Sequence, residues 1–283
     1  MIKILKEEER SILFETDNLT TEEVNGLRRI IKTKIPNRSM KITKLLNIEI
    51  STVYEEIEQN LSFIPLKIYD DYEKFTFSLK KKNKDKNNIK ELSTDHIKWF
   101  YNFEPYTKEV FPEKYYFYQL NPTDSIHLEG IVEEGIGKIH KRFDSVYGVK
   151  YKLLENNNYL LGFSTNGADT AKNTLKKALE ILVSIFEKIQ KIISKGDEKI
   201  IQIETINEND IKIRFLEESF EIHSIIASQI KQLYKDKYFV GSNSIFYDKE
   251  DAFIRLNTSD NTIIETAVEE TRKKFYNILK HIN

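Results

Sequence analysis

The same order of predicted elements (strand, helix, strands, long helix) occurs twice in this sequence, and this recurrence restricts the folds that the chain can adopt. In the first half a strand (11–15) and a helix (21–35) come first, and a long helix (169–193) closes the half. In the second half, strands within 200–216 are followed by a helix (219–236), two more strands and a final helix (261–281). The halves share a pattern rather than identical residues, as distant structural repeats do.

This pattern predicts an α+β fold with two dimerisation units. The first comprises residues 1–37 and 144–195, the second comprises 200–283, and a β-rich domain (38–143) is inserted into the first. Apolar residues recur at helical spacing along the helices of both halves, so the halves are expected to pair as an intramolecular pseudo-dimer. The residues expected at this internal interface are Val24, Leu27, Ile31, Leu179, Leu182, Phe186, Ile226, Ile230, Val268 and Phe275.

The residues that most catalytic and metal chemistry requires are missing from the sequence. There is no cysteine, which excludes disulfides, thiolate metal sites and cysteine nucleophiles. The five histidines are scattered without a zinc-type pair, and each is expected to be an exposed or partly buried ring. The glycine cluster GIVEEGIGKIH (130–140) lacks the spacing and the Ser/Thr of a nucleotide-binding loop. We therefore expect no catalytic residue, no cofactor and no metal.

Charge and hydropathy predict an intracellular protein without membrane contact. The formal net charge of −1 gives no overall attraction to nucleic acid or to a membrane surface. No apolar stretch has the length of a signal core or of a membrane span. The lysine-rich segment KKKNKDKNNIK (80–90) is expected to be a solvated loop, and a basic patch that touches nucleic-acid phosphates is the alternative.

Two adjacent arginines lie in the first predicted helix. Thr20 and Glu23 form a capping-box pattern at its start, and Pro36 marks its end. On a helical wheel of about 100° per residue, Arg28 lies at the flank of the apolar face and Arg29 lies almost opposite that face. Both side chains could be solvated, or they could grip carboxylates or carbonyls of a partner.

Several segments resemble the alpha-type subunits of RNA polymerase, which are bacterial alpha, archaeal D and the third-largest eukaryotic subunit. NGLRRIIKTKIPN (25–37) resembles the first helix of these subunits. NLSFIPL (60–66) resembles a second segment of theirs, with Ser62 in place of a glycine. Residues 128–146 resemble their glycine-containing loop. FVGSNSIFY (239–247) and RLNT (255–258) resemble the small partner subunit, archaeal L or the eukaryotic eleventh subunit, although ESFEIHSII lacks the usual opening of its helix. The matching residues of the first half are Asn25, Gly26, Leu27, Arg28, Arg29, Pro36, Gly135, Gly137, Lys138, His140 and Phe143.

The resemblance implies a fusion of the two alpha-like partners, as in some large DNA viruses, acting as a non-catalytic assembly platform of a multisubunit DNA-directed RNA polymerase. Such a chain would be monomeric within the complex, dock the two largest subunits and a small accessory subunit, and meet DNA only indirectly. A viral chain would be located in the cytoplasm or the virion. The alternative is a nucleic-acid-binding protein that uses residues 80–90. The large-subunit contacts that the resemblance implies are Asn25, Arg28, Arg29, Gly135, Gly137, Lys138, His140 and Phe143.

Overall fold

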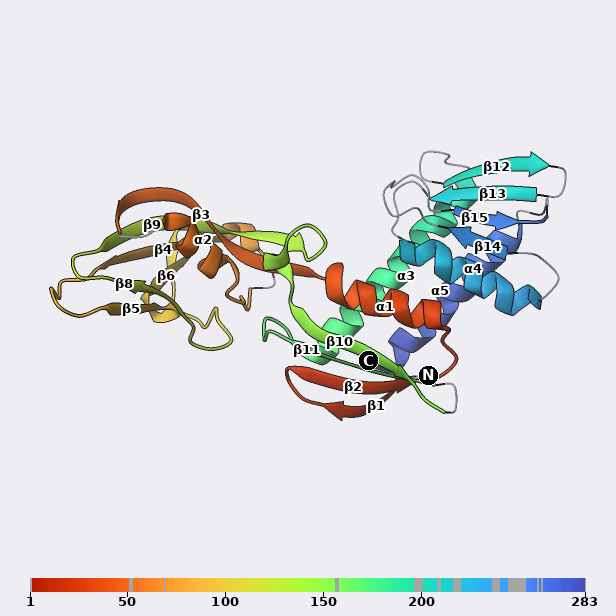
Figure 1. The fold of residues 1–283 in the computed structure, drawn as a ribbon, viewed down its shortest axis with the longest axis horizontal. Coiled ribbons are helices and arrows are strands. Elements are labelled where there is room, and N and C mark those ends of the chain that lie inside the picture. The colour runs from red at the N-terminus through yellow and green to blue at the C-terminus, as the bar shows by residue number, and fades with distance from the viewer. Residues whose placement is uncertain are drawn as a thin grey trace. The chain divides into compact units, whose positions relative to one another are not determined.

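The chain mixes helices with antiparallel sheets and divides into two units (Figure 1). The computed structural model describes residues 1–283 except 1, 51–52, 69, 156–157, 196–200, 208–209, 216–219, 236–239, 244–252, 259, 261 and 283. Unit 1 consists of residues 1–31, 148–163 and 171–283, and unit 2 consists of 32–147 and 164–170. The sequence predicted an inserted domain over 38–143, whereas unit 2 begins within the first helix and also takes in 164–170.

Two four-stranded sheets of the same strand order belong to the two halves of the sequence. The first sheet has the order β1-β2-β11-β10 and the second has the order β12-β13-β15-β14, so both run 1-2-4-3 in their own chain order. In both halves one helix follows the second strand and another follows the fourth. The elements of the first half are β1 (Ile2–Glu7), β2 (Ser11–Thr16), α1 (Thr21–Thr33), β10 (Val146–Leu153), β11 (Tyr159–Thr165) and α3 (Ala171–Lys195).

The second half repeats this plan with shorter strands and without an insertion. Strand β13 pairs antiparallel with both β12 and β15, and β14 pairs antiparallel with β15. The four helices α1, α3, α4 and α5 lie between the two sheets (Figure 1), and their apolar sides form the core of unit 1. The elements of this half are β12 (Ile201–Asn207), β13 (Asp210–Phe215), α4 (Phe220–Tyr234), β14 (Val240–Asn243), β15 (Phe253–Leu256) and α5 (Thr262–Ile282).

Unit 2 is built on a five-stranded sheet of order β3-β9-β4-β6-β7, with β5 and β8 paired separately. The long strands β3 and β9 pair from Pro36 opposite Ile136 to Glu49 opposite Ser125, with two register shifts between. Phe77 and Trp99 lie at the centre of an apolar core beneath this sheet. The elements are β3 (Pro36–Glu49), α2 (Tyr54–Ser62), β4 (Phe75–Lys82), β5 (Lys90–Ser93), β6 (Ile97–Tyr101), β7 (Glu104–Tyr106), β8 (Tyr116–Leu120), β9 (Ser125–Ile136) and three single 3-10 turns, Tyr72–Lys74, Thr94–His96 and Lys141–Phe143.

Two local predictions differ from the structure. Residues 54–62 form helix α2 within a segment expected to be β-rich, because Ile57 and Leu61, four residues apart, both point into the core. The basic segment is only partly a loop, since β4 continues to Lys82 by pairing with β9. SKGDEK (194–199), whose composition predicts a linker between the halves, lies mostly outside the described residues, and so does the first of the two strands expected within SIFYDKEDAFIRLNT (244–258).

Candidate interaction surfaces

Helix α1 begins with the predicted capping box, and the carboxylate of this box also forms a buried ion pair. The Thr20 N–H donates to Glu23 Oε2 at 2.7 Å, and the Glu23 N–H donates to Thr20 Oγ1 at 3.2 Å. Lys274 of α5 donates to both oxygens of Glu23, at 3.0 and 2.7 Å. Burial raises the pKa of Glu23, although Lys274 and the Thr20 N–H act in the opposite direction. One side chain thus caps α1 and joins it to the last helix of the chain.

The two arginines of α1 differ in exposure. Arg28 is half-buried and donates from Nε to Asn25 Oδ1 at 3.0 Å, so two of the predicted contact residues form a pair on one face of the helix. Arg29 is exposed. This arrangement leaves the guanidinium end of Arg28 oriented by its own helix, which lowers the entropy lost when an arginine binds a carboxylate.

The loop after β9 is held in shape by close packing around its glycines. A Cβ atom at Gly135 would lie 2.4 Å from the ring of Phe143, and a Cβ at Gly137 would lie 1.9 Å from Asp144 Oδ1. Lys138 donates its N–H to the Thr33 carbonyl at 2.9 Å, which ties the loop to the last residue of α1. Phe143 is buried, with the Arg142 guanidinium 4.8 Å above its ring. Gly135, Gly137 and Phe143 therefore shape the loop from within and do not project from it.

The tip of this loop is exposed. Lys138, His140 and Lys141 lie at the surface around Ile139, whose side chain is 76% exposed. His140 Nδ1 accepts the Arg142 N–H at 3.2 Å, which orients the imidazole at the start of the last 3-10 turn. Lys138 and His140 were expected at a contact surface from the sequence, whereas Ile139 was not. The feature of the sequence that could have indicated Ile139 is an apolar residue placed among charged residues in a glycine-containing loop.

All ten side chains expected at the internal interface are buried in unit 1. They come from α1, α3, α4 and α5, and each is at most 1% exposed. Phe186 of α3 stacks on Phe275 of α5 with ring centroids 6.1 Å apart. Polar contacts also join helices of different halves, since Ser228 of α4 donates to Glu22 at 2.9 Å and Arg272 of α5 lies 3.7 Å from Glu187 of α3.

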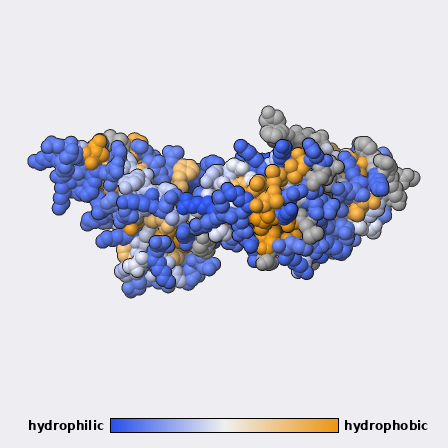
Figure 2. Space-filling model, turned by 90° about the horizontal axis from the view of Figure 1, so that it is seen from below, coloured by the Kyte–Doolittle hydropathy of each residue, from blue (hydrophilic) through white to orange (hydrophobic). Residues whose placement is uncertain are grey.

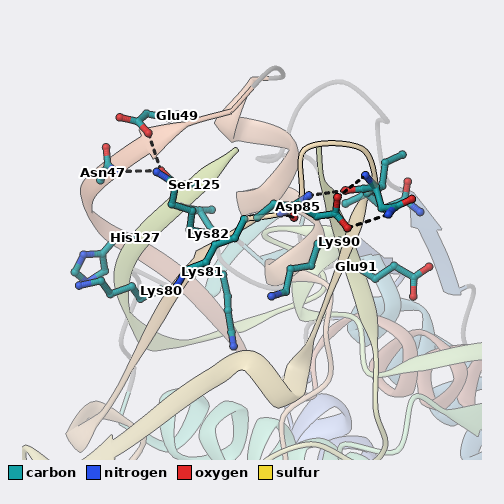
Figure 3. Close-up of a pocket in the computed structure, with 16 residues that line it drawn as sticks. Asn47, Glu49, Lys80, Lys81, Lys82, Asp85, Lys90, Glu91, Ser125 and His127 are labelled. Atoms are coloured by element: carbon teal, nitrogen blue, oxygen red, sulfur yellow. Dashed lines mark hydrogen bonds between the residues drawn. The ribbon is translucent and has the colours of Figure 1, made fainter. Parts of the chain in front are cut away.

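A lysine-lined groove crosses unit 2 where β4 ends and where β5 and β9 begin (Figure 3). It has a volume of about 1360 Å³. In the close-up the side chains of Lys80, Lys81, Lys82 and Lys90 occupy its middle, while Glu49 and Glu91 lie on opposite sides. The remaining lining residues include Asn47, Asn83, Lys84, Asp85, Gln119, Ser125 and His127.

An apolar patch lies on the outer side of unit 1. Figure 2 shows apolar residues gathered on the face viewed from below, which is the side of the first sheet in Figure 1. Leu5 of β1 and Leu153 of β10 are exposed on this sheet. Apolar side chains that cluster on a surface indicate a contact with another molecule more often than single exposed ones do.

The described part of the chain contains neither a metal-ligand cluster nor a membrane-spanning helix. No group of three His, Asp or Glu side chains is placed to hold an ion among the described residues. No helix there is long and apolar enough to cross a membrane. One histidine differs from expectation, because His223 of α4 is fully buried, with Nε2 3.3 Å from Ser224 Oγ.

No protein-family model and no curated protein matches this chain. The topology of unit 1, the loop after β9 and the groove are the features of the molecule that bear on its function.

Proposed function

We propose that this chain is a non-catalytic assembly subunit of a multisubunit DNA-directed RNA polymerase, formed by two alpha-like units fused in one polypeptide. The observation that carries the proposal is the shared topology of the two halves of unit 1. Each half has a four-stranded sheet of order 1-2-4-3, and each places its helices on the same side of that sheet, against the helices of the other half. Two units related in this way form an intramolecular pseudo-dimer.

Burial of the helix faces supports a permanent pairing of the halves. Leu27, Phe186, Ile230 and Phe275 are completely buried, and they come from four different helices. Interfaces with such apolar cores resemble a protein interior and belong to obligate assemblies. The pseudo-dimer therefore fits a scaffold whose two partner-binding sides are fixed relative to each other within unit 1.

Two surfaces are proposed as contacts to the large subunits. On unit 1, Asn25, Arg28 and Arg29 present polar groups from the side of α1 that does not enter the core. On unit 2, the rigid loop after β9 presents Lys138, Ile139 and His140 at its tip. An exposed apolar residue surrounded by charged ones on a fixed loop matches the common anatomy of a protein interface, an apolar centre with a polar rim.

Affinity purification of the tagged chain from its native source tests this function. We expect two much larger chains to co-purify in equal molar amounts, and the purified complex to synthesise RNA on a DNA template while the isolated chain does not. A chain that purifies without partners at low and at moderate salt would contradict the proposal. A tagged variant with the buried Leu27→Asp change serves as the control for loss of the folded unit.

A further inference from the structure

Five lysines of unit 2 line the groove of Figure 3. Lys80, Lys81 and Lys82 end β4, Lys84 lies in the following turn, and Lys90 begins β5. None of the five forms a salt bridge within the described part of the chain. Other lysines of the same unit do form salt bridges: Lys41 lies 2.5 Å from Glu133, and Lys74 lies 2.9 Å from Asp71.

The carboxylates beside these lysines are already used by the fold. Asp85 accepts the N–H groups of Asn87 and Asn88, at 2.9 and 3.2 Å, and these bonds lower the pKa of Asp85. Glu49 accepts the Ser125 hydroxyl at 2.9 Å at one side of the groove. These carboxylates keep their negative charges, so with Glu91 the lining sets five lysines against three carboxylates, and none of the three forms a salt bridge with a groove lysine among the described residues.

The turn that carries Lys84 is fixed, so the lysines stand on a rigid frame. Asn83 is buried and donates from Nδ2 to the carbonyls of Asn88, Leu120 and Asn121, at 2.8, 3.1 and 3.1 Å. Its Oδ1 accepts the Asp85 N–H at 3.1 Å. A pre-formed backbone lowers the ordering cost of binding, because only the lysine side chains lose freedom when a ligand enters.

Besides burial, the positive charge of these lysines lowers the pKa of His96, a neighbouring residue of the same unit. The pKa of His96 is lowered, first by burial and then by the charges of Lys81 and Lys90. The whole chain carries a formal net charge of only −1, so this field is local to the groove and does not follow from overall composition.

The lining offers positive charge without a guanidinium fork or a large aromatic platform. Among its described residues it contains lysines but no arginine, so it presents point charges and not the planar fork that makes bidentate contacts. No phenylalanine, tyrosine or tryptophan is among the described residues of its lining, so the groove lacks the large aromatic platform on which bases stack, and His127 is the one ring there. We infer that this groove binds the phosphate backbone of a nucleic acid without reading its sequence, a direct contact that the assembly role does not require.

Fluorescence anisotropy with the full chain and a labelled oligonucleotide of mixed sequence tests the inference, with a single strand and the corresponding duplex as separate arms. The test variant is Lys80→Gln/Lys82→Gln/Lys84→Gln. The matched control is Lys86→Gln/Lys98→Gln/Lys108→Gln, which removes the same charge from exposed positions of unit 2 outside the groove lining. Melting curves of both variants establish that the fold is kept.

At low salt we expect the groove variant to bind the better of the two probes roughly tenfold or more weakly than the control variant does. The slope of log affinity against log salt should become about 2 units less steep for a single strand, at about 0.7 for each phosphate that a lysine no longer neutralises. Equal reductions of affinity in both variants would overturn the inference. So would displacement of the oligonucleotide by polyglutamate at the same concentration of charge, because the groove would then not prefer phosphate.

If the triple groove variant melts well below the control, the single variants Lys80→Gln and Lys82→Gln replace it, since neither side chain is buried. Each should then reduce the salt slope by about 0.7. An unchanged slope in both single variants would overturn the inference.

Discussion

At the scale of single residues, the burial of Glu23 makes stability depend on pH in an unusual direction, although its partner Lys274 opposes the effect. Burial raises the pKa of Glu23 in the folded chain above its ordinary value, so the folded state binds this proton more tightly than the unfolded state does. The contribution of Glu23 to stability is therefore fully present below its unfolded pKa and is lost as pH rises through its folded pKa. Most paired carboxylates act in the opposite direction.

Removing Lys274 should expose this dependence. Lys274→Met keeps the apolar stem but leaves the Glu23 carboxylate buried without its cation, and we expect unfolding to become easier by about 3–5 kcal/mol at neutral pH. The destabilisation should shrink in acid, where Glu23 is protonated. Denaturant unfolding at several pH values measures it.

The double variant Glu23→Gln/Lys274→Met is the matched control. It removes both charges, and glutamine can still accept the Thr20 N–H of the capping box. We expect it to recover most of the stability that Lys274→Met removes. A double variant as unstable as Lys274→Met alone would show that the lysine stem, and not the charge balance, is what matters.

The cap could be predicted from the sequence, because Thr20 and Glu23 are local neighbours with a known spacing. The ion pair could not, since Lys274 lies 251 residues further along the chain and no local pattern links the two. The same limit applies to Phe143 and Gly135. Their types were identified through the resemblance, but the direct packing of ring on glycine needed coordinates.

At the scale of elements, one side of α1 packs in the core of unit 1, and the arginines on its other side are proposed to bind a partner. Substitutions on the two sides should therefore have different effects. Leu27→Asp places a charge in the core of unit 1, so we expect a destabilisation of about 3 kcal/mol or more and partial or complete unfolding.

Arg28→Ala/Arg29→Ala should change the stability of the isolated chain by only about 0.5 kcal/mol. If the arginines contact a large subunit, the same double change should weaken assembly by roughly 2 kcal/mol. Melting temperature and co-purification are measured for both variants. Normal assembly of the double-alanine variant would remove the arginines from the proposed interface.

The loop after β9 depends on the space that Gly135 leaves for Phe143. Gly135→Ala puts a methyl group where the ring lies, and we expect a destabilisation of about 1–3 kcal/mol from overpacking. Gly135→Ala/Phe143→Leu should restore part of that stability, because leucine leaves room for the added carbon. Thermal unfolding of the three proteins checks this. Failure of the leucine to recover any stability would indicate that the backbone of the loop, and not the ring, sets the requirement.

Long elements were predictable and short ones were not. The four helices of unit 1 repeat their apolar spacing over several turns, and each begins and ends close to its predicted bounds. Helix α2 has only nine residues and few apolar positions, too few to establish a period. Lys80, Lys81 and Lys82 belong to a strand because β4 continues its pairing with β9, and tertiary pairing of this kind outweighs local composition.

At the scale of the whole molecule, the internal repeat determines the expected oligomeric state. Because the helix faces of each half are already covered by the other half in the described part of unit 1, we expect the isolated chain to scatter light as a monomer close to its 33.5 kDa. A stable dimer would contradict the internal pairing of the halves. A dimer that dissociates on Leu5→Lys would instead assign self-association to the apolar patch on the first sheet.

The ladder between β3 and β9 also has a consequence for the order of events during synthesis. Strands β2 and β11 are neighbours in the first sheet, yet the whole of β3 to β9 is translated between them. Closing so long a connection while it is unfolded costs entropy and slows folding. Once Pro36 pairs with Ile136, however, the ends of the insertion lie side by side and act as a short connection. The half that emerges first from the ribosome thus has to wait for the insertion to fold, and a weakened β3–β9 ladder should delay its completion.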